Sequence, residues 1–446
     1  MTQSYRTSAV DIDIKTVNII SEASVKTEIW AMIEQFRISE SLLLPIAFGE
    51  CTILDGVNLI DNTLLKGFGH IQFSFGTPDV SKYITKSFRI YNIVDRKRVT
   101  NSAQTYRVLF CSEELFLASQ YTQSKSFNGK LVSDIVKDIA VNVLKIPTKK
   151  LEIEQTVGQI DGMIPYMRPL EAINKMSRKA LTATDHPSFM FYETLNEGFK
   201  FKSVETLFKQ QPVAEYTYKQ ARLDSSVIDP FNIVAYTIKR NFDTLSNTQA
   251  GKYAANMMTF DILRQAVETI KYDAQQFFDK NIHLEGKGNK SVNKMEPIQN
   301  RKGDVPNKAL ESHSRFVMTT LKQPNNSYIK ARDPNIKPLQ VEKTDLQRNA
   351  FLQNFVDHRV KLVVPGNPTI KSGDIIKLNI VAPEDQSAAT KDELLGGNYI
   401  VATVTHIMTP ARKYFTEMSV VKDDVKPSSG SPVNSNKSET GFGGVF

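Results

Sequence analysis

The stretch Ile71-Gln72-Phe73-Ser74-Phe75 alternates large apolar side chains with polar ones. A period of two residues is that of a β-strand with one buried face. Tyr106, Val108 and Phe110 repeat this alternation, and the run 88–94 between them is rich in β-branched and aromatic residues. Turn-forming residues separate these runs at Asp55-Gly56, Gly67, Gly69 and Gly76-Thr77-Pro78. Several strands at this spacing predict a β-sandwich or a β-barrel over residues 1–112.

Further along the chain the period changes from two to 3.6 residues. One stripe of a predicted helix carries the apolar residues Leu131, Val132, Ile135, Val136, Ile139, Ala140, Val143 and Leu144. A second helix is predicted to begin near Pro169, because proline suits the first helical position. The runs 189–193 and 199–202, joined through Asn196-Glu197-Gly198, predict a hairpin. Together these elements predict a small α+β unit over residues 119–208.

The second half of the chain returns to β patterns. Strands are predicted at 232–240, at β-like stretches within 253–271, and at 360–364, 375–381, 399–408 and 414–421. The segment 284–348 shows little periodicity and carries 13 Lys and Arg against 7 Asp and Glu. It is too long for an ordinary loop, so we predict an extended polar insertion there. One helix is predicted at 348–358, and a flexible tail is predicted from Lys422 onward.

Composition and charge restrict the class of protein. The 446 residues, 41% hydrophobic and 23% charged, are typical of a folded chain of two to four domains. No apolar run reaches the roughly 20 residues that span a bilayer, and the first residues lack the apolar stretch of a secretory signal. Six of the eight net positive charges lie in 284–348, which favours a solvated basic loop over a nucleic-acid-binding surface. Cys51 and Cys111 are predicted to be buried thiols, as in a protein assembled in a cytoplasm.

The sequence contains no catalytic constellation that we could identify. It lacks a His-Glu-x-x-His motif and a Gly-x-Ser-x-Gly elbow. The histidines have no metal-ligand spacing: His70, His186, His283, His313, His358 and His406. The run 286–291 resembles a phosphate loop only superficially, because the first glycine of that motif is missing. A distant carboxylate pair could act as acid and base, but no pair stands out. Asp374 and His406 are better explained by turn and strand structure. We therefore predict no catalytic, cofactor-binding or metal-binding residue.

Three groups of motifs follow one another along the chain. The first group is Ser126-Phe127-Asn128-Gly129-Lys130-Leu131, with 164–173 and the hairpin 189–201. The second is Phe242-Asp243-Thr244-Leu245, with Gly251-Lys252-Tyr253-Ala254 and Phe260-Asp261. The third is Val364-Pro365-Gly366-Asn367, with Gly373-Asp374-Ile375-Ile376, Leu395-Gly396-Gly397-Asn398-Tyr399-Ile400 and Thr405-His406. In this order and spacing, these motifs resemble the baseplate hub family of contractile-tailed bacteriophages, to which the hub portion of type VI secretion spike proteins is related. Together with the β-rich opening, the resemblance covers about residues 10–425.

The resemblance implies a mainly β fold with two tube-type antiparallel β-barrel domains and an inserted α+β domain. We place the first barrel at 1–118, the α+β domain at 119–208 and the second barrel at 209–283 plus 349–425. The polar basic insertion is placed at 284–348 and the flexible C-terminal tail at 426–446. In such hubs three copies form a pseudo-sixfold ring, which meets the tail tube on one face and a trimeric spike on the other.

For this chain the resemblance predicts a non-enzymatic structural subunit of the virion baseplate, assembled in the host cytoplasm. Its expected partners are two further copies, the tail tube protein, the trimeric spike and other baseplate proteins. No cofactor or membrane insertion is expected, and nucleic acid is expected only as the transiting genome. Two alternatives remain open at this stage. One is a peptidoglycan hydrolase of the tail tip, and the other is the hub of a tailocin or a type VI-like injection apparatus.

Overall fold

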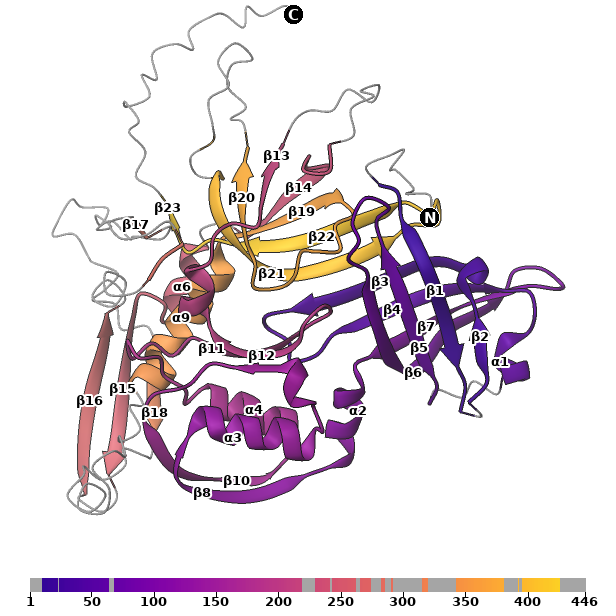
Figure 1. Ribbon diagram of the computed structural model, residues 1–446. Coiled ribbons are helices and arrows are strands. Elements are labelled where there is room, and N and C mark those ends of the chain that lie inside the picture. Colours follow the sequence, from indigo (N-terminus) through magenta and orange to yellow (C-terminus); the bar gives the residue numbers. More distant parts are fainter. Residues whose placement is uncertain are drawn as a thin grey trace, which may run out of the picture.

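The computed structural model describes residues 10–22, 24–63, 68–218, 229–240, 243–261, 265–273, 282–284, 290–291, 315–319, 342–380, 392 and 395–425. Within these ranges the chain is mainly β with a small α+β unit, which confirms the predicted fold class. One 13-stranded sheet runs through both β regions. The α+β unit lies below this sheet in Figure 1, and a separate small sheet lies to its left. The tail predicted at 426–446 and most of the insertion predicted at 284–348 lie outside the described residues.

The first barrel contains the strands drawn in indigo and purple in Figure 1. Its strands are β1 (Asp13–Ile20), β2 (Lys26–Glu28), β3 (Ile33–Ser41), β4 (Phe48–Asp55), β5 (His70–Gly76), β6 (Ile84–Arg98) and β7 (Gln104–Cys111). β1 pairs with β5, and the pairing continues through β6, β7 and β4 to β3. The segment from β2 to β3, which includes a 3-10 turn at Trp30–Met32, pairs with β1 at its start and with β4 at its end. This bent segment therefore closes the sheet into a barrel.

The alternation seen in the sequence fills this barrel. Phe73 and Phe75 of β5 and Phe110 of β7 are buried in its core, together with Phe36 and Phe88. The helix α1 (Leu59–Thr63) follows β4, and α2 (Glu113–Gln120) leads from β7 into the α+β unit. Each large side chain buried in this way contributes about 1.5–3 kcal/mol, so the strand pattern and the core stabilise the same arrangement. Cys51 and Cys111 are free and buried, as predicted from their apolar surroundings.

The second barrel is built from β13 (Ala214–Thr217), β14 (Ala235–Arg240), β19 (Arg359–Pro365), β20 (Ile375–Asn379), β21 (Gly397–Met408) and β22 (Tyr414–Val421). β13 pairs with β20, and the pairing continues through β21, β22 and β19 to β14. An isolated bridge between Thr217 and Asn232, just before β14, closes the ring of strands. The core of this barrel includes Tyr216, Leu362, Tyr399 and Met418, all fully buried.

The two barrels have the same cyclic order of strand pairing. The correspondence is β1 with β13, the segment β2–β3 with β14, β4 with β19, β5 with β20, β6 with β21 and β7 with β22. One difference is that β1 runs antiparallel to β5, whereas β13 runs parallel to β20. The registers also correspond. Arg89 faces Cys111 with a bulge one residue later, and Ile400 faces Val421 with a bulge at the same distance.

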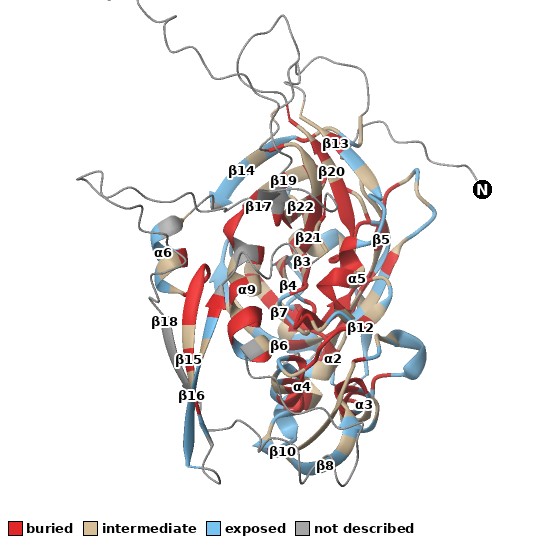
Figure 2. Cartoon of the chain, turned by 90° about the vertical axis from the view of Figure 1, so that its left-hand side faces the viewer, coloured by how far each residue is buried: buried red, intermediate tan, exposed pale blue. Residues whose placement is uncertain are grey.

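The α+β unit contains both predicted helices and the predicted hairpin. Its helices are α3 (Val132–Asp138), which continues as a π-helical turn at Ile139–Val143, α4 (Pro169–Ser177) and α5 (Val204–Phe208). Its strands are β8 (Gln123–Leu131), β9 (Leu151–Ile153), β10 (Gln159–Met167), β11 (Phe189–Thr194) and β12 (Gly198–Ser203), with a 3-10 turn at Thr148–Lys150. Pro169 occupies the first turn of α4, as expected. The apolar stripes of α3 and α4 pack with Phe189 and Phe201 in one core, drawn red in Figure 2.

A third sheet departs from the predicted division of the chain. The range 209–283 was assigned to the second barrel, but β15 (Ala254–Asp261) and β16 (Ala266–Asp273) pair with each other outside the barrel sheet. The partner on the other side of β15 is β18 (Arg315–Thr319), which lies within the range predicted as an extended insertion. Strand periodicity shows that one face is buried but does not identify the neighbouring strand, so this sheet could not be assigned from the sequence. The division into domains remains a proposal.

The helix predicted at 348–358 is present as α9 (Arg348–Asp357), after a π-helical turn at Glu342–Gln347; the short helix α6 (Thr244–Gln249) precedes β15. The start of the tail predicted at Lys422 is wrong. Lys422 and Asp423 are buried, and β23 (Asp424–Val425) pairs with β17 (Lys290–Ser291). Among the described residues no helix is long and apolar enough to cross a membrane.

Candidate functional site at the junction of the barrels and the α+β unit

The two barrels are joined edge to edge by β3 and β21, which pair over residues 36–41 and 403–408. The strand β21 is long enough to serve two neighbours, because its first residues pair with β20 and its last with β3. One face of this seam is polar, where Ser39 hydrogen-bonds Thr405 at 2.9 Å and Ser41 hydrogen-bonds Thr403 at 3.0 Å. The other face is buried, and it contributes Ile38 and Met408 to the first core and Val404 to the second. Since backbone pairing continues across the seam, the two barrels form one sheet.

Glu40, on the buried face of β3, holds all three units together. One of its oxygens accepts a hydrogen bond from the backbone N–H of Leu195, in the hairpin turn of the α+β unit, at 2.5 Å. The other accepts from the N–H of Ser372, in the second barrel, also at 2.5 Å. Its exposed fraction is 1%, and burial raises the pKa of its carboxyl from 4.5 to about 7 against the lowering effect of these hydrogen bonds. Buried polar atoms satisfied by backbone groups fix the relative placement of the units that supply them.

Glu193 joins the α+β unit to the first barrel in the same way, through a buried carboxylate. It accepts hydrogen bonds from the N–H of Ala47 at 2.7 Å and from the hydroxyl of Ser112 at 2.5 Å, and it forms an ion pair with Lys86. Burial lowers the pKa of Lys86 to about 8. Next to this contact, a cavity of about 480 Å³ separates the outer face of β5 and β6 from the β11–β12 turn. Its lining carries four carboxylates and two lysines, and one of these carboxylates, Glu193, is paired with Lys86.

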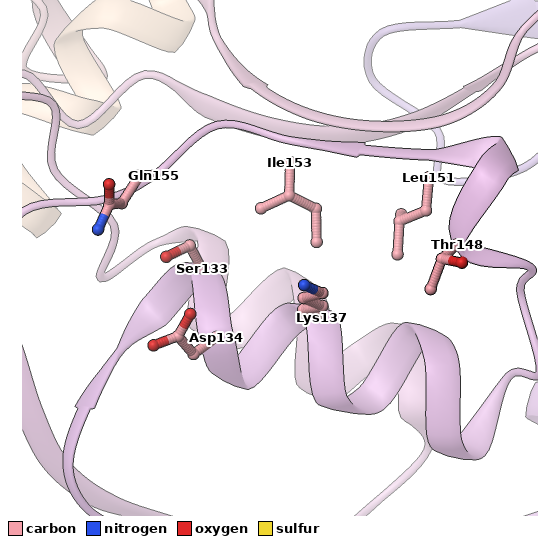
Figure 3. A pocket seen from close by; sticks show the side chains of 7 residues that line it. All are labelled: Ser133, Asp134, Lys137, Thr148, Leu151, Ile153 and Gln155. Carbon is pink, nitrogen blue, oxygen red and sulfur yellow. The ribbon is translucent and has the colours of Figure 1, made fainter.

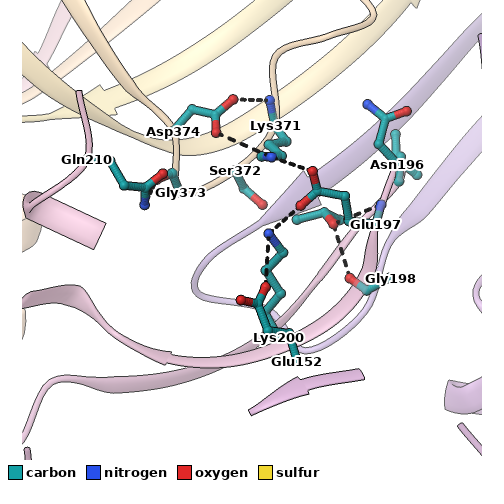
Figure 4. Close-up of polar contacts among 12 residues, drawn as sticks. Glu152, Asn196, Glu197, Gly198, Lys200, Gln210, Lys371, Ser372, Gly373 and Asp374 are labelled. Atoms are coloured by element: carbon teal, nitrogen blue, oxygen red, sulfur yellow. Dashed lines mark hydrogen bonds and ion pairs between the residues drawn. The ribbon is translucent and has the colours of Figure 1, made fainter. Parts of the chain in front are cut away.

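Figure 4 shows a polar cluster between the hairpin turn and the loop 371–374 of the second barrel. Glu197 binds both Lys200, from its own hairpin, and Lys371, from the second barrel; the contact with Lys371 is 2.5 Å. Burial raises the pKa of Glu197, but the hydrogen bonds from these lysines outweigh it and bring the pKa to about 2. Lys200 also lies 3.6 Å from Glu152 on β9. The cluster is therefore an alternating set of charges that joins two units.

A glycine in the same loop explains a sequence motif. Gly373 has a φ of +91°, a left-handed conformation that favours glycine, and its N–H donates to the carbonyl of Val401. Gly366 is required for a different reason, since a Cβ there would lie 1.9 Å from the ring of Tyr414. Each of these glycines thus meets a requirement of the backbone, a positive φ at Gly373 and a close approach to a ring at Gly366.

The structure gives Asp374 and His406 structural surroundings. Asp374 accepts a hydrogen bond from the N–H of Lys371 at 3.1 Å within its turn, and burial raises its pKa. His406 has no exposed surface, its Nδ1 lies 2.7 Å from the hydroxyl of Tyr414, and burial lowers its pKa to about 3. Among the described residues, no hydrogen bond or ion pair joins the side chains of Asp374 and His406.

The other described histidines have different surroundings. His70 pairs with Glu113 at 3.2 Å, and His283 with Asp423 at 2.9 Å. His186 and His358 are buried, which lowers the pKa of each to about 4. His313 lies outside the described residues. Among the described residues no group of three or more His, Cys, Asp and Glu side chains could hold a metal ion.

A groove of about 390 Å³ lies between α3 and β9 (Figure 3). Leu151 and Ile153 point from the strand toward the helix, where Ser133, Asp134 and Lys137 form the opposite wall. The groove thus has an apolar side on β9 and a polar side on α3. It contains no histidine or cysteine, and its one carboxylate and one amine do not form a catalytic arrangement.

Comparison with known proteins places this fold. No family model and no curated protein sequence matches the chain. A tail protein from Neisseria meningitidis MC58 matches with a TM-score of 0.52 at 10% identity, over 92% of this chain and 96% of that one. A 43 kDa tail protein of prophage MuSo2 from Shewanella oneidensis matches with a TM-score of 0.53 at 9% identity, over 91% and 98%. The chain has the fold of these tail proteins. The resemblance inferred from the motifs is thereby confirmed at the level of fold.

A further match at a lower score is an E. coli component of the type VI secretion system that is structurally similar to tail proteins of bacteriophage T4. Its TM-score is 0.41 at 9% identity, over 94% of this chain and 79% of that one.

Sequence reasoning missed the acids at the junction, Glu40 and Glu193. Their partners are mostly backbone N–H groups more than 100 positions away in the chain. Such partners leave no pattern in the sequence, although an acid at an inward position of an otherwise apolar strand is a usable signal.

Proposed function

We propose that this chain is the structural hub subunit of a contractile-tail baseplate, working as a homotrimer with pseudo-sixfold symmetry. The observation that carries the proposal is the edge-to-edge pairing of two barrels with the same strand order through β3 and β21. Two similar barrels per chain let three chains present six similar faces, which matches a threefold spike to a sixfold tube. The fold shared with two tail proteins supports this role.

The proposed partners are two further copies of the chain, the tail tube protein on one face and a trimeric spike on the other. Other baseplate proteins are proposed to contact the segment 284–348. The chain would thus belong to the virion baseplate, with nucleic acid present only as the genome passing through the ring. We propose no enzymatic role, because the buried acids at the junction, Glu40 and Glu193, use their oxygens to hold backbone and hydroxyl groups.

The test is co-expression of the chain with the tube and spike proteins encoded beside it, followed by light scattering and electron microscopy of the purified complex. The proposal predicts a trimer of this chain and a ring that carries the spike on one face. A protein that stays monomeric and binds neither partner contradicts it. Release of soluble fragments from peptidoglycan by the purified chain would instead favour the tail-tip hydrolase. Capsid genes beside this one would separate a phage from a tailocin or a secretion apparatus.

A further inference from the structure

The correspondence between the barrels identifies which strands should meet in a neighbouring copy. Within the chain, β21 of the second barrel pairs with β3 of the first. The equivalent of β21 in the first barrel is β6, because both follow the same neighbours and carry a bulge at the same place. The equivalent of β3 in the second barrel is β14, because each pairs with the strand that lies next to β7 or β22.

Both equivalents present an open edge. Beyond Ile90 the strand β6 pairs only with β7, and β14 pairs only with β19, among the residues that the structure describes. In contrast, the matching parts of β21 and β3 cover each other. The exposure of matching side chains on the covered and open edges differs accordingly. Ile38 of β3 is fully buried, whereas its equivalent Ile238 in β14 is 40% exposed. Figure 2 shows β14 largely as an exposed strand on the outside of the second barrel.

Long exposed edges with apolar side chains promote strand addition, and soluble monomers usually protect them. On β6 the open part includes Tyr91, which is half exposed, and the partly buried Ile93 and Val94. On β14 Ile238 is exposed, and so is Val234 immediately before the strand. The two edges lie on different barrels, so one copy can offer both at once. A partner that supplies the matching edge at each end is a second copy of this chain.

We infer that β6 of one copy pairs antiparallel with β14 of the next copy and so repeats the β3–β21 seam between subunits. This inference rests on the proposed hub function and names the strands of its subunit interface. A head-to-tail contact of this kind forms a closed ring when the rotation between neighbours divides a full turn. If each seam turns one barrel onto the next by the same angle, three chains close the ring proposed above.

The in-chain seam also predicts the register. Thr405 faces Ser39, Ile407 faces Arg37 and Met408 faces Phe36. Transferred through the equivalent neighbours, these pairs become Val94 opposite Arg240, Lys97 opposite Thr237 and Arg98 opposite Tyr236. Between them, Asp95 falls opposite Lys239 and Arg96 opposite Ile238.

This register also suits the charges. It places the carboxylate of Asp95, which also binds Arg107 in its own chain, opposite the ammonium of Lys239, and opposite charges in this position are stabilising. A shift of two residues in one direction would instead place Arg96 opposite Arg240 and Lys97 opposite Lys239, and like charges directly opposite are destabilising. Arg98 opposite Tyr236 pairs a guanidinium with an aromatic ring, a favourable combination.

Cysteine cross-linking tests the register directly. Lys97→Cys with Thr237→Cys, and separately Arg98→Cys with Tyr236→Cys, should form disulfides between copies and give a dimer and trimer ladder on non-reducing gels. Two neighbouring pairs are used because antiparallel pairs alternate between closer and wider spacing. Lys97→Cys with Ala235→Cys, which is shifted by two residues, is the matched control and should cross-link much less. Stronger cross-linking in the shifted pair would overturn the register.

A charge on the edge tests the interface in the otherwise unchanged protein. Ile238→Lys places a cation opposite Arg96. It should convert the trimer to a monomer at protein concentrations where the wild type stays assembled, with at least tenfold weaker association. Val267→Lys, at a position on β16 that is also exposed, is the control and should remain trimeric. A trimeric wild type whose Ile238→Lys variant assembles normally and whose cysteine pairs stay reduced overturns this interface but leaves the hub proposal standing. A wild type that is monomeric alone and with its partner proteins overturns both.

Discussion

In the first barrel, the outer edge of the strand β3 is covered by β21. In the second barrel, the outer edge of the equivalent strand, β14, is open among the described residues. Ile38 and Ile238 occupy matching positions on these strands, and only Ile38 is buried. The local sequence does not explain this difference in burial, because both are isoleucines next to an aromatic-containing stretch. The difference follows from the neighbouring strand, because β21 covers the outer edge of β3 whereas no described strand covers that of β14. A single chain with two barrels can form one such seam with itself, and the second seam requires another copy.

A second matched site shows how the barrels differ chemically while keeping their geometry. In the first barrel Arg107 on β7 binds Glu50 on β4 at 2.9 Å. At the equivalent places in the second barrel, Glu417 on β22 binds Lys361 on β19 at 2.8 Å. The ion pair has the same position with its charges exchanged. The barrels therefore share a cross-strand contact without sharing the residues that form it.

The largest expected effect comes from placing a charge at the two matching isoleucines. Ile38→Asp should abolish soluble folded protein, because an unpaired charge buried in the seam costs several kcal/mol. Ile238→Asp should leave the melting temperature of the isolated chain nearly unchanged, because its side chain reaches water. Soluble yield and thermal unfolding measure both. Equal stability of the two variants would contradict the equivalence of covered and open edges.

The next effect concerns the acid that joins the three units. Glu40→Ala leaves the N–H groups of Leu195 and Ser372 without their acceptor, which should lower the free energy of unfolding by about 2–5 kcal/mol. Glu34→Ala, on the same strand but partly exposed, is the matched control and should cost little. Chemical denaturation measures the loss, and limited proteolysis should show earlier cleavage between the units. A similar loss in both variants would mean that Glu40 acts only through strand propensity.

The pH dependence should show two opposing contributions. His186, His358 and His406 have folded pKa values of about 4, 4 and 3, below the unfolded value of 6.5. Below pH 6.5 the unfolded chain therefore binds more protons, and each histidine should remove about 2–3 kcal/mol of stability by pH 4.5. Glu40 acts in the opposite direction, because its folded pKa of about 7 exceeds its unfolded value of 4.5. Its contribution grows as the pH falls from 7 to 4.5.

Three histidines should outweigh one carboxyl, so the free energy of unfolding is expected to fall between pH 6.5 and pH 4.5. His406→Phe keeps the ring volume and should flatten this slope, although it also loses the hydrogen bond with Tyr414. Denaturant titrations at several pH values measure the slope. A His406→Phe variant with the wild-type slope would show that His406 is protonated in the folded protein.

The smallest expected effect is at the exchanged ion pairs. Glu417→Gln should lower the free energy of unfolding by at most about 1 kcal/mol, because its contacts with Lys361 and Arg37 are partly exposed. High salt should remove most of the difference between variant and wild type. A double-mutant cycle with Lys361→Met isolates the pair. A salt-independent loss of several kcal/mol would indicate a role in packing instead.

The sequence by itself determined the secondary structure and the kind of core. The alternation at 71–75 became β5, the stripe at 131–144 became α3 and its π-helical turn, and Pro169 began α4. Both cysteines are buried as their apolar surroundings implied. These features depend on the side-chain period along one element, which is visible in a linear sequence.

Only the tertiary structure decided which elements are neighbours. The seam pairs residues 36–41 with 403–408, Glu40 binds backbone at 195 and 372, and β15 pairs with a strand from 315–319. Backbone N–H and C=O groups are the same in every residue except proline, so a sequence does not record which strand they will join. The open edges of β6 and β14 became visible in the same way, once the covered seam was available for comparison.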